Sequence, residues 1–268
     1  MIIQKIGLLL CLISIASCTN KQGGQGRVES ELTGSVKITK VPDVDWVAVS
    51  PEYDGLSLQT FMAATSQLES RLKSDDSALS ETEPGLKTVH PQKQKAAIIV
   101  DVDETVISNL DVQKQFQANG KYDANLMVAW QKKGKASAMP GALEFLQLAA
   151  QKGVTIFYVT NRGAAVEKGT RKNLASLGFP LSTQIDTVLM KNERKNWTGD
   201  KASRRLFVEK DFRVIMLIGD DLNDFISAKH LSKNARDEAI MRYKNFWGNK
   251  WFLLPNPMYG SWQKLIDQ

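Results

Sequence analysis

The stretch AAIIVDVDET, residues 96–105, is the part of the chain that decides the fold. Its apolar, β-branched run is typical of a strand buried on both faces of a parallel sheet. Asp101 and Asp103 follow where the run ends, and side-chain alternation points both to the same side. Ligands of open parallel sheets bind beyond the carboxyl ends of the strands, so this pair is a candidate for cation binding and for nucleophile and acid/base chemistry. Taken alone, the motif is equally compatible with a helix cap through Asp103 or Thr105.

The length and composition of the chain are those of an ordinary globular protein. Its 268 residues suffice for one sizeable α/β domain with an insertion, or for two small domains. Hydrophobic residues make up 43% and charged residues 24%, which is usual for a soluble domain. The net charge of +6 comes from scattered basic residues. It favours anionic ligands or surfaces, and no nucleic-acid polymer is expected as a partner.

The N-terminus has the features of a bacterial lipoprotein signal. A short, positively charged start precedes an apolar stretch at residues 6–15, which is too short to span a bilayer comfortably. The sequence Ile15-Ala16-Ser17-Cys18 resembles a lipobox, so residues 1–17 are predicted to be removed and Cys18 to be lipidated. An ordinary secretory signal is the alternative. Cys11 would leave with the signal, so the mature chain would form no disulfide.

Residues 18–43 are polar and rich in glycine, and are expected to act as a flexible tether. Because each buried methylene group contributes about 0.8 kcal/mol, several acyl chains on one cysteine would hold the protein on a membrane. Thr19 lacks the aspartate-type signal for retention at the inner membrane, which favours the outer membrane in a cell that has one. The protein is therefore expected to be anchored in the cell envelope while working in water.

The rest of the chain predicts an α/β fold with a Rossmann-like parallel sheet sandwiched by helices. Residues 44–95 form an N-terminal segment, helical from about Pro51, that is expected to contribute to a smaller domain. The core spans residues 96–268 and carries a helical cap insertion at about 106–139. From Pro140 onward helices alternate with strands, which implies right-handed parallel crossovers. The predicted strands are 96–102, 154–160, 186–190, 212–221 and 250–257.

Two further groups of polar residues lie where predicted elements begin or end. Thr160 and Asn161 lie at the end of the second predicted strand, where backbone N–H groups favour an anion, although a simple helix cap explains them too. Lys201 begins a helix, with Lys191 as its competitor for contact with a phosphate; a lone lysine is otherwise a solvated surface charge. Phosphoryl transfer needs positive charge of this kind on the equatorial oxygens.

The segment GDDLNDF, residues 219–225, places three carboxylates at the end of the fourth predicted strand. Asp220, Asp221 and Asp224 would repel one another unless they were exposed, protonated or bound to a metal. Together with Asp101 and Asp103 they form two acid clusters at the ends of two strands. A nucleophile and a cation that bridges it to a phosphate could both come from such a set.

The order DVDET, Thr160, a lysine and GDDLND resembles the four-part signature of haloacid dehalogenase (HAD) superfamily phosphatases. The resemblance is closer to the lipoprotein-type class C bacterial acid phosphatases, some of which act as 5'-nucleotidases, and spans about Trp46 to Trp262. It is carried by SPEYDGLSLQ, MPGALEFL, FYVTNR, GDDLNDF and above all LLPNPMYGSW.

That resemblance implies a role for each matching residue. Asp101 would attack phosphorus and form an aspartyl-phosphate, while Asp103 would protonate the leaving group and then activate water. Mg²⁺ would be held by the Asp101 carboxylate, the Asp103 carbonyl and Asp220. The residues implied to bind the phosphoryl oxygens are Thr160, Asn161 and Lys201. Trp130 and Tyr259 match the aromatic side chains that stack on a base or aryl group; core packing is the simpler explanation of both.

The chain departs from the family at Asp221, where asparagine is usual, which leaves open whether Asp221 or Asp224 joins the metal shell. Nucleoside 5'-monophosphates and aryl phosphates are the expected substrates. An acidic pH optimum is expected because Asp103 must carry a proton, which its neighbouring carboxylates favour. A ligand-binding lipoprotein and a phosphotransferase are the alternative functions, and a homodimer stays open.

Overall fold

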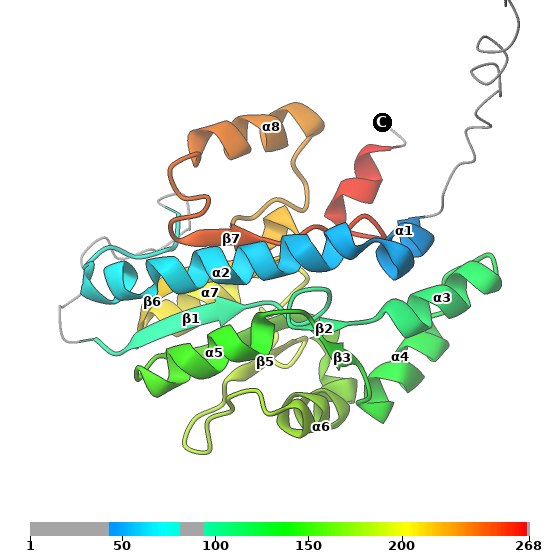
Figure 1. The fold of residues 1–268 in the computed structure, drawn as a ribbon, viewed down its shortest axis with the longest axis horizontal. Helices are drawn as coiled ribbons and strands as arrows, with labels where there is room; N and C mark the ends of the chain where they lie inside the picture. Colours follow the sequence, from blue (N-terminus) through cyan, green and yellow to red (C-terminus); the bar gives the residue numbers. More distant parts are fainter. Residues whose placement is uncertain (1–42, 81–93, 267–268) are drawn as a thin grey trace, which may run out of the picture. The chain divides into compact units, whose positions relative to one another are not determined.

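The computed structural model describes residues 43–80 and 94–266 (Figure 1). The predicted signal peptide, the lipidation site at Cys18 and almost all of the predicted tether lie outside the described residues, as do residues 81–93 of a predicted loop. Within the described ranges, every helix is too short or too polar to cross a bilayer.

A parallel sheet of five strands forms the centre of the fold, in the order β5-β4-β1-β6-β7. This sheet confirms the predicted fold class. The strand bounds differ from the predicted ones: β1 stops two residues earlier, at Val100, β6 stops at Gly219 and β7 at Leu253, while β4 continues to Gly163, which pairs with Lys191. The strands are β1 (Ala96–Val100), β4 (Thr155–Gly163), β5 (Val188–Lys191), β6 (Arg213–Gly219) and β7 (Trp251–Leu253).

Alternation along the strands sends apolar side chains into two separate cores. In β1, Ile98 and Val100 join one buried cluster, while Ala97 and Ile99 join the other. The helices α2 (Pro51–Lys73), α5 (Ala142–Gln151) and α6 (Glu167–Leu177) contribute to the first core. The helices α7 (Ala202–Glu209) and α8 (Lys233–Arg242) contribute to the second. The sheet is therefore buried on both faces, as its continuous apolar strands require.

The predicted cap insertion contains a small hairpin as well as helices. β2 (Ile107–Ser108) and β3 (Ser137–Ala138) pair in antiparallel fashion at its base. Between them lie α3 (Leu110–Ala118) and α4 (Ala124–Lys133), which Figure 1 shows beside the sheet end. Helix α4 packs on α6, and α1 (Asp43–Val49) packs on α3. Of the N-terminal segment, α1 thus lies against cap helix α3, while α2 runs along the sheet.

The topology places the carboxyl ends of β1 and β6 at one crevice. The chain moves from β1 to β4 and β5 on one side, then returns to β6 on the other side of β1. Such a switch point is where ligands bind in open α/β sheets. The 3-10 helix η2 (Leu222–Asp224) follows β6 at this point, and the 3-10 helix η3 (Ser261–Leu265) ends the described chain; a third, η1 (Ala164–Val166), follows β4.

Candidate active site

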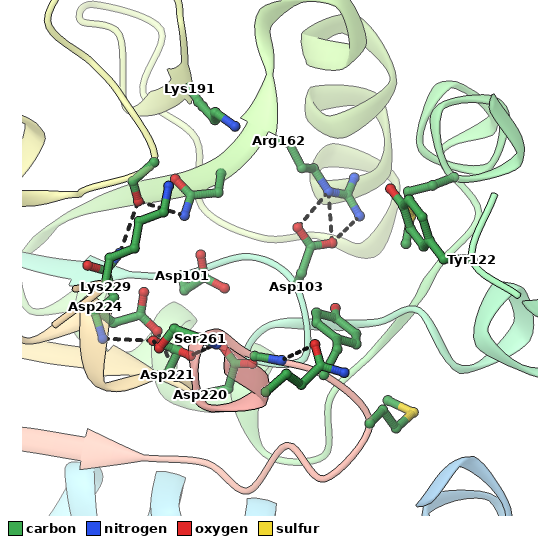
Figure 2. Close-up of a pocket in the computed structure, with 18 of the residues that line it drawn as sticks. Asp101, Asp103, Tyr122, Arg162, Lys191, Asp220, Asp221, Asp224, Lys229 and Ser261 are labelled. Carbon is green, nitrogen blue, oxygen red and sulfur yellow. Dashed lines mark hydrogen bonds and ion pairs between the residues drawn. The ribbon is translucent and has the colours of Figure 1, made fainter. Parts of the chain in front are cut away.

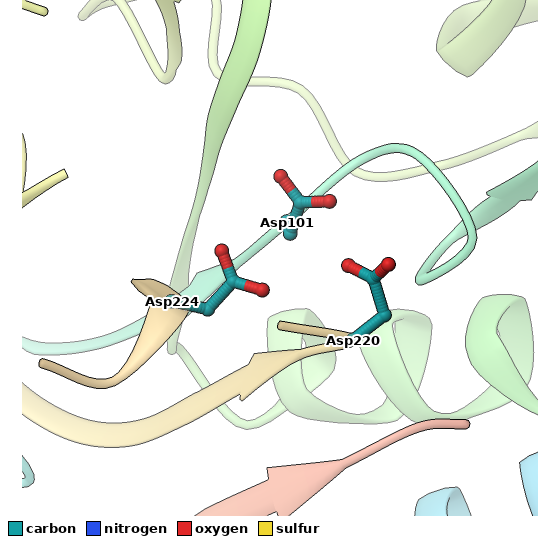
Figure 3. A group of neighbouring side chains, drawn as sticks. All are labelled: Asp101, Asp220 and Asp224. Atoms are coloured by element: carbon teal, nitrogen blue, oxygen red, sulfur yellow. The ribbon is translucent and has the colours of Figure 1, made fainter. Parts of the chain in front are cut away.

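Carboxylates from two sheet strands and a 3-10 helix converge at the switch point. Asp101 follows β1, Asp220 follows β6, and Asp224 ends η2. One carboxylate oxygen from each of these residues lies within 4.8 Å of the others, and Figure 3 shows the three side chains facing one another. Oxygen ligands at this spacing suit a hard divalent cation. Gly219 makes the arrangement possible, because a Cβ there would collide with the Asp224 carboxylate.

Lys201 is the lysine that reaches this cluster. Its Nζ donates to Asp101 Oδ1 and to Asp224 Oδ1, the latter at 2.5 Å, and the side chain is almost completely buried. It is the N-cap residue of α7, which directs its amine back toward the strand ends. Lys191, the competitor, lines the same cavity farther from the carboxylates (Figure 2). The structure thus brings Lys201 to the nucleophile candidate.

Burial and mutual repulsion raise the proton affinity of two of these acids. Burial, together with the charges of Asp224 and Asp103, raises the pKa of Asp101 to about 7, although Lys201 opposes the shift. Burial and the charges of Asp101 and Asp224 raise the pKa of Asp220 well above its ordinary value. The positive charges nearby therefore do not fully balance the carboxylates of the cluster. A bound cation would supply the missing positive charge.

Asp103 has a different environment from Asp101, because Arg162 holds it. The guanidinium donates from Nη2 to Asp103 Oδ1 at 2.7 Å and from Nε to both oxygens at 2.9 and 3.1 Å (Figure 2). Burial favours protonation of Asp103, but the charge and hydrogen bonds of Arg162, with help from Asn109, lower its pKa. The expected reason for a protonated Asp103, its neighbouring carboxylates, is therefore wrong: the arginine outweighs them.

Arg162 and Asn109 are site residues that sequence reasoning missed. Arg162 is the last residue of the quoted motif FYVTNR, so a signal was present, but nothing in its spacing assigned it a partner. The Asn109 side chain donates to Asp103 Oδ1 at 2.6 Å and to Glu104 Oε2 at 3.0 Å. Burial and the charge of Asp103 raise the pKa of Glu104 to about 8.

The predicted phosphate ligands after β4 differ in their access to the cavity. Asn161 lines it, donates to Gly199 O at 3.0 Å and accepts from Arg204 at 2.7 Å. Thr160 is fully buried, and its Oγ1 accepts the backbone N–H of Arg162 at 3.1 Å. Thr160 is therefore not one of the described residues that line the cavity.

The two predicted stacking residues also differ. Tyr259 lines the cavity, whereas Trp130 is not among the described residues that line it and donates from Nε1 to Asn109 Oδ1 at 2.9 Å. A third aromatic side chain, Tyr122, lines the cavity on the cap side (Figure 2) and is 65% exposed. Tyr122 thus presents the ring surface that was expected of Trp130.

Asp221 points away from the carboxylate cluster, toward the C-terminal segment, residues 254–266, which follows β7 and includes η3. Its carboxylate accepts from the Ser261 backbone N–H at 2.6 Å, the Ser261 hydroxyl at 2.7 Å and the Asn223 N–H at 2.9 Å. Its own N–H donates to Asp224 Oδ2 at 3.0 Å. Asp221, the residue that departs from the family pattern, therefore holds the start of η3. The acid that lies with Asp101 and Asp220 is Asp224.

These residues surround one cavity of about 720 Å³ between the strand ends, the cap and the C-terminal segment. Its floor is polar and carries the carboxylates, Lys201 and Arg162. Apolar and aromatic side chains from both the cap and the C-terminal segment contribute to its wall, and they include Phe116, Tyr122, Met127, Met258 and Tyr259. A cavity of this size, with a few convergent polar groups, fits a small organic ligand with one anionic end.

The family model of the HAD superfamily, subfamily IIIB (acid phosphatase), matches residues 39–262, and the chain belongs to this family. It is a phosphomonoesterase of the acid phosphatase type. The fold is similar to that of the class C acid phosphatase from Bacillus anthracis, with a TM-score of 0.71 and 28% identity over 84% of this chain and 86% of that one. The same relative with tungstate bound matches equally well. These findings confirm the resemblance seen in the sequence.

Proposed function

We propose that this acid phosphatase is Mg²⁺-dependent and hydrolyses its substrates through a phosphorylated Asp101. The observation that carries the proposal is the gathering of Asp101, Asp220 and Asp224 within 4.8 Å, beside Asp103. All three donors are carboxylate oxygens, which Mg²⁺ prefers, and Lys201 pairs with two of them, those of Asp101 and Asp224. The residues therefore fit Mg²⁺, which Asp101, Asp220 and Asp224 would hold together with the Asp103 carbonyl.

The side chains divide the chemistry between them. Asp101 attacks phosphorus in line, and Asp103 gives its proton to the departing oxygen. Asp103 then takes a proton from the water that hydrolyses the aspartyl-phosphate. Lys201 and Asn161 neutralise and orient the phosphoryl oxygens, while bound Mg²⁺ would supply further positive charge to those oxygens. Tungstate, an oxyanion of similar shape to phosphate, occupies the relative from Bacillus anthracis, which supports an oxyanion site here.

An acidic pH optimum follows from the position of Asp103. Catalysis of the first step needs this residue protonated, and Arg162 lowers its pKa in spite of burial. A lower pKa moves the protonated form to lower pH, so activity should be highest at acidic pH and fall as the pH rises. The sequence also led us to expect an acidic optimum, but there the reason was the neighbouring carboxylates, whereas here it is the lowered pKa of Asp103 beside Arg162.

We further propose nucleoside 5'-monophosphates and aryl phosphates as substrates. The phosphate would lie on the polar floor of the cavity and the base or aryl ring against Tyr259 and Tyr122. Stacking of this kind contributes about 1–3 kcal/mol per base and accepts different bases. Broad use of nucleotides is the expected consequence.

The membrane anchor is a separate proposal that rests on Ile15-Ala16-Ser17-Cys18. We propose that Cys18 is lipidated and holds the enzyme on the outer membrane. Cells that express the full chain should incorporate a labelled fatty acid into it, and the Cys18→Ser variant should not. Equal labelling of the variant would contradict the proposal.

The enzymatic proposal is tested by phosphate release from nucleoside 5'-monophosphates and p-nitrophenyl phosphate, with Mg²⁺ and with EDTA. We expect Asp101→Asn and EDTA each to abolish release, and tungstate to compete with substrate. Asp111→Asn, an exposed aspartate on α3, is the matched control and should retain activity. Activity that survives Asp101→Asn, or that is indifferent to EDTA and added Mg²⁺, would contradict the proposal.

A further inference from the structure

The side chain of Asn109 lies between the acid/base carboxylate and two aromatic rings. Its amide nitrogen donates to Asp103 at 2.6 Å, and its carbonyl oxygen accepts from Trp130 Nε1 at 2.9 Å and from Arg162 Nη2 at 3.3 Å. The hydroxyl of Tyr259 is 3.5 Å from the same amide nitrogen. Asn109 is completely buried, so these neighbours, and not water, determine its orientation.

The chemistry of the neighbours allows only one orientation of the amide. Trp130 Nε1–H and the Arg162 guanidinium can only donate, so the carbonyl oxygen must face them. The ionised Asp103 carboxylate can only accept, so the NH₂ group must face it. The position therefore requires a side chain with an acceptor on one side and donors on the other. Aspartate and leucine have a similar shape, but neither provides both an acceptor and donors. The backbone N–H of Asn109 also donates to Glu104 Oε1 at 2.6 Å, which fixes the start of α3.

We propose that Asn109 is a positioning residue that ties the orientation of Asp103 to that of Trp130 on the cap and Tyr259 on the C-terminal segment. The inference rests on the proposed role of Asp103 as general acid. In this arrangement, cap helix α4 and the C-terminal segment set the direction in which Asp103 presents its proton. Loss of the Asn109 side chain leaves Arg162 as the partner of Asp103 but removes the link to both rings.

The consequence depends on the leaving group. A nucleoside 5'-oxygen or a glycerol oxygen departs poorly as an anion and needs the proton from Asp103. The p-nitrophenolate ion is stable, so its departure needs little help. A misplaced acid therefore slows the first two substrates and spares p-nitrophenyl phosphate. A general loss of folded structure would slow all three alike.

The test compares kcat and KM of the mature enzyme and of Asn109→Ala on these three substrates, with Mg²⁺ present. We expect kcat for the nucleoside monophosphate and for glycerol phosphate to fall on the order of tenfold to a hundredfold, since small displacements of a catalytic group cost about this much. The kcat for p-nitrophenyl phosphate should change several times less. Equal losses on all three substrates would overturn the proposal. Asn234→Ala, an exposed asparagine on α8, is the matched control.

Trp130→Phe tests the same link without touching Asn109, and it serves if Asn109→Ala fails to fold. The variant keeps a ring but removes the N–H that holds the Asn109 carbonyl. We expect a several-fold lower kcat on glycerol phosphate, which has no ring to stack, and a non-additive effect when the two changes are combined. An unchanged kcat on glycerol phosphate, or strict additivity, would overturn the coupling.

These outcomes are separable from failure of the proposed nucleotide substrates. If the wild-type enzyme hydrolyses only p-nitrophenyl and glycerol phosphates, nucleotides are wrong as substrates. The contrast between the two remaining leaving groups then still tests Asn109.

Discussion

At the residue scale, the site is decided by which partner each carboxylate has. Asp101 has Lys201, with two other carboxylates nearby, and its pKa rises to about 7 because burial and those charges outweigh the lysine. Desolvation also favours protonation of Asp103, which is partly exposed, but the guanidinium of Arg162 lowers its pKa. Two aspartates only two positions apart therefore have opposite pKa shifts, because their charged neighbours differ.

Arg162→Met should move the pH dependence of the enzyme. Without the guanidinium, the effect of burial on Asp103 is opposed only by Asn109 and Lys201, so its pKa rises and its proton persists to higher pH. We expect the alkaline limb of the kcat profile for glycerol phosphate to shift upward by about one pH unit, with a lower maximum. Arg162→Lys keeps the charge but loses the paired contacts, so its alkaline limb should lie between those of the wild-type enzyme and Arg162→Met. An alkaline limb that stays in place would show that Asp103 is not the acid.

Asp221→Asn and Asp224→Asn should separate the two acids of η2. Because Asp224 lies with Asp101 and Asp220, its loss should raise the Mg²⁺ concentration for half-maximal activity about 10- to 100-fold. Asp221 holds Ser261, so its loss should change this concentration far less and should lower the melting temperature. Titration of activity with Mg²⁺ checks both. A larger metal effect from Asp221→Asn would place it in the metal shell.

At the element scale, the cap is fixed to the core by close backbone packing of α4 on α6. A Cβ at Gly169 would lie 2.7 Å from Lys132 Cα, so only glycine allows this approach. The Asn173 side chain on α6 adds hydrogen bonds of 2.8 and 2.9 Å to the backbone of Ala136, where the chain returns from the cap. The position of the cap over the site therefore depends on small and polar residues of one core helix.

Gly169→Ala should destabilise the enzyme although alanine is the better helix former. The added methyl group must push α4 away, which we expect to cost about 1–3 kcal/mol and to raise KM for nucleotides. Gly55→Ala, in α2, is the matched control because its Cβ would enter open space. There the substitution should stabilise by about 0.5–1 kcal/mol. Urea unfolding measures both, and a stabilised Gly169→Ala would refute the packing argument.

At the scale of the whole molecule, buried carboxyls couple stability to pH and to metal. Burial is the largest cause that raises the pKa of Asp101 to about 7 and of Glu104 to about 8, and Asp220 is raised as well. Their ordinary values are 3.8 for aspartate and 4.5 for glutamate. A raised pKa means that the folded state binds protons more tightly than the unfolded state, so folding is favoured at low pH. Asp103, with its lowered pKa, acts in the opposite sense only below 3.8.

In EDTA, the free energy of unfolding should therefore fall as the pH rises from about 4 to about 8. Mg²⁺ that binds only the folded state should reverse part of this loss, by about 2.7 kcal/mol at about 100 times its Kd. Asp220→Asn removes one of the opposed charges and should flatten the pH dependence while it abolishes the response to Mg²⁺. Thermal melts across this range, with and without Mg²⁺, provide the measurement. Stability in EDTA that increases toward pH 8 would contradict the coupling.

Much of the fold could be predicted because its signals are local. The apolar runs of β1, β4 and β6 alternate with helical stretches, and that pattern implies a parallel sheet with its site at the strand ends. Strand ends moved by one to four residues, because pairing with a neighbour, such as Gly163 with Lys191, decides where a strand stops. The hairpin at the base of the cap went unrecognised, since its strands have only two residues each.

The sequence by itself determined the sheet, the family and the identity of Asp101, Asp103, Lys201 and the acids after β6 as candidates, because periodicity and motif order are properties of neighbouring residues. Only the tertiary structure decided what those groups contact. It brought Arg162 to Asp103 across 59 positions, placed Asn109 between the acid and two rings, and turned Asp221 toward Ser261. The physical reason is that pKa and orientation depend on distances of a few ångströms between side chains, which folding sets and sequence spacing does not.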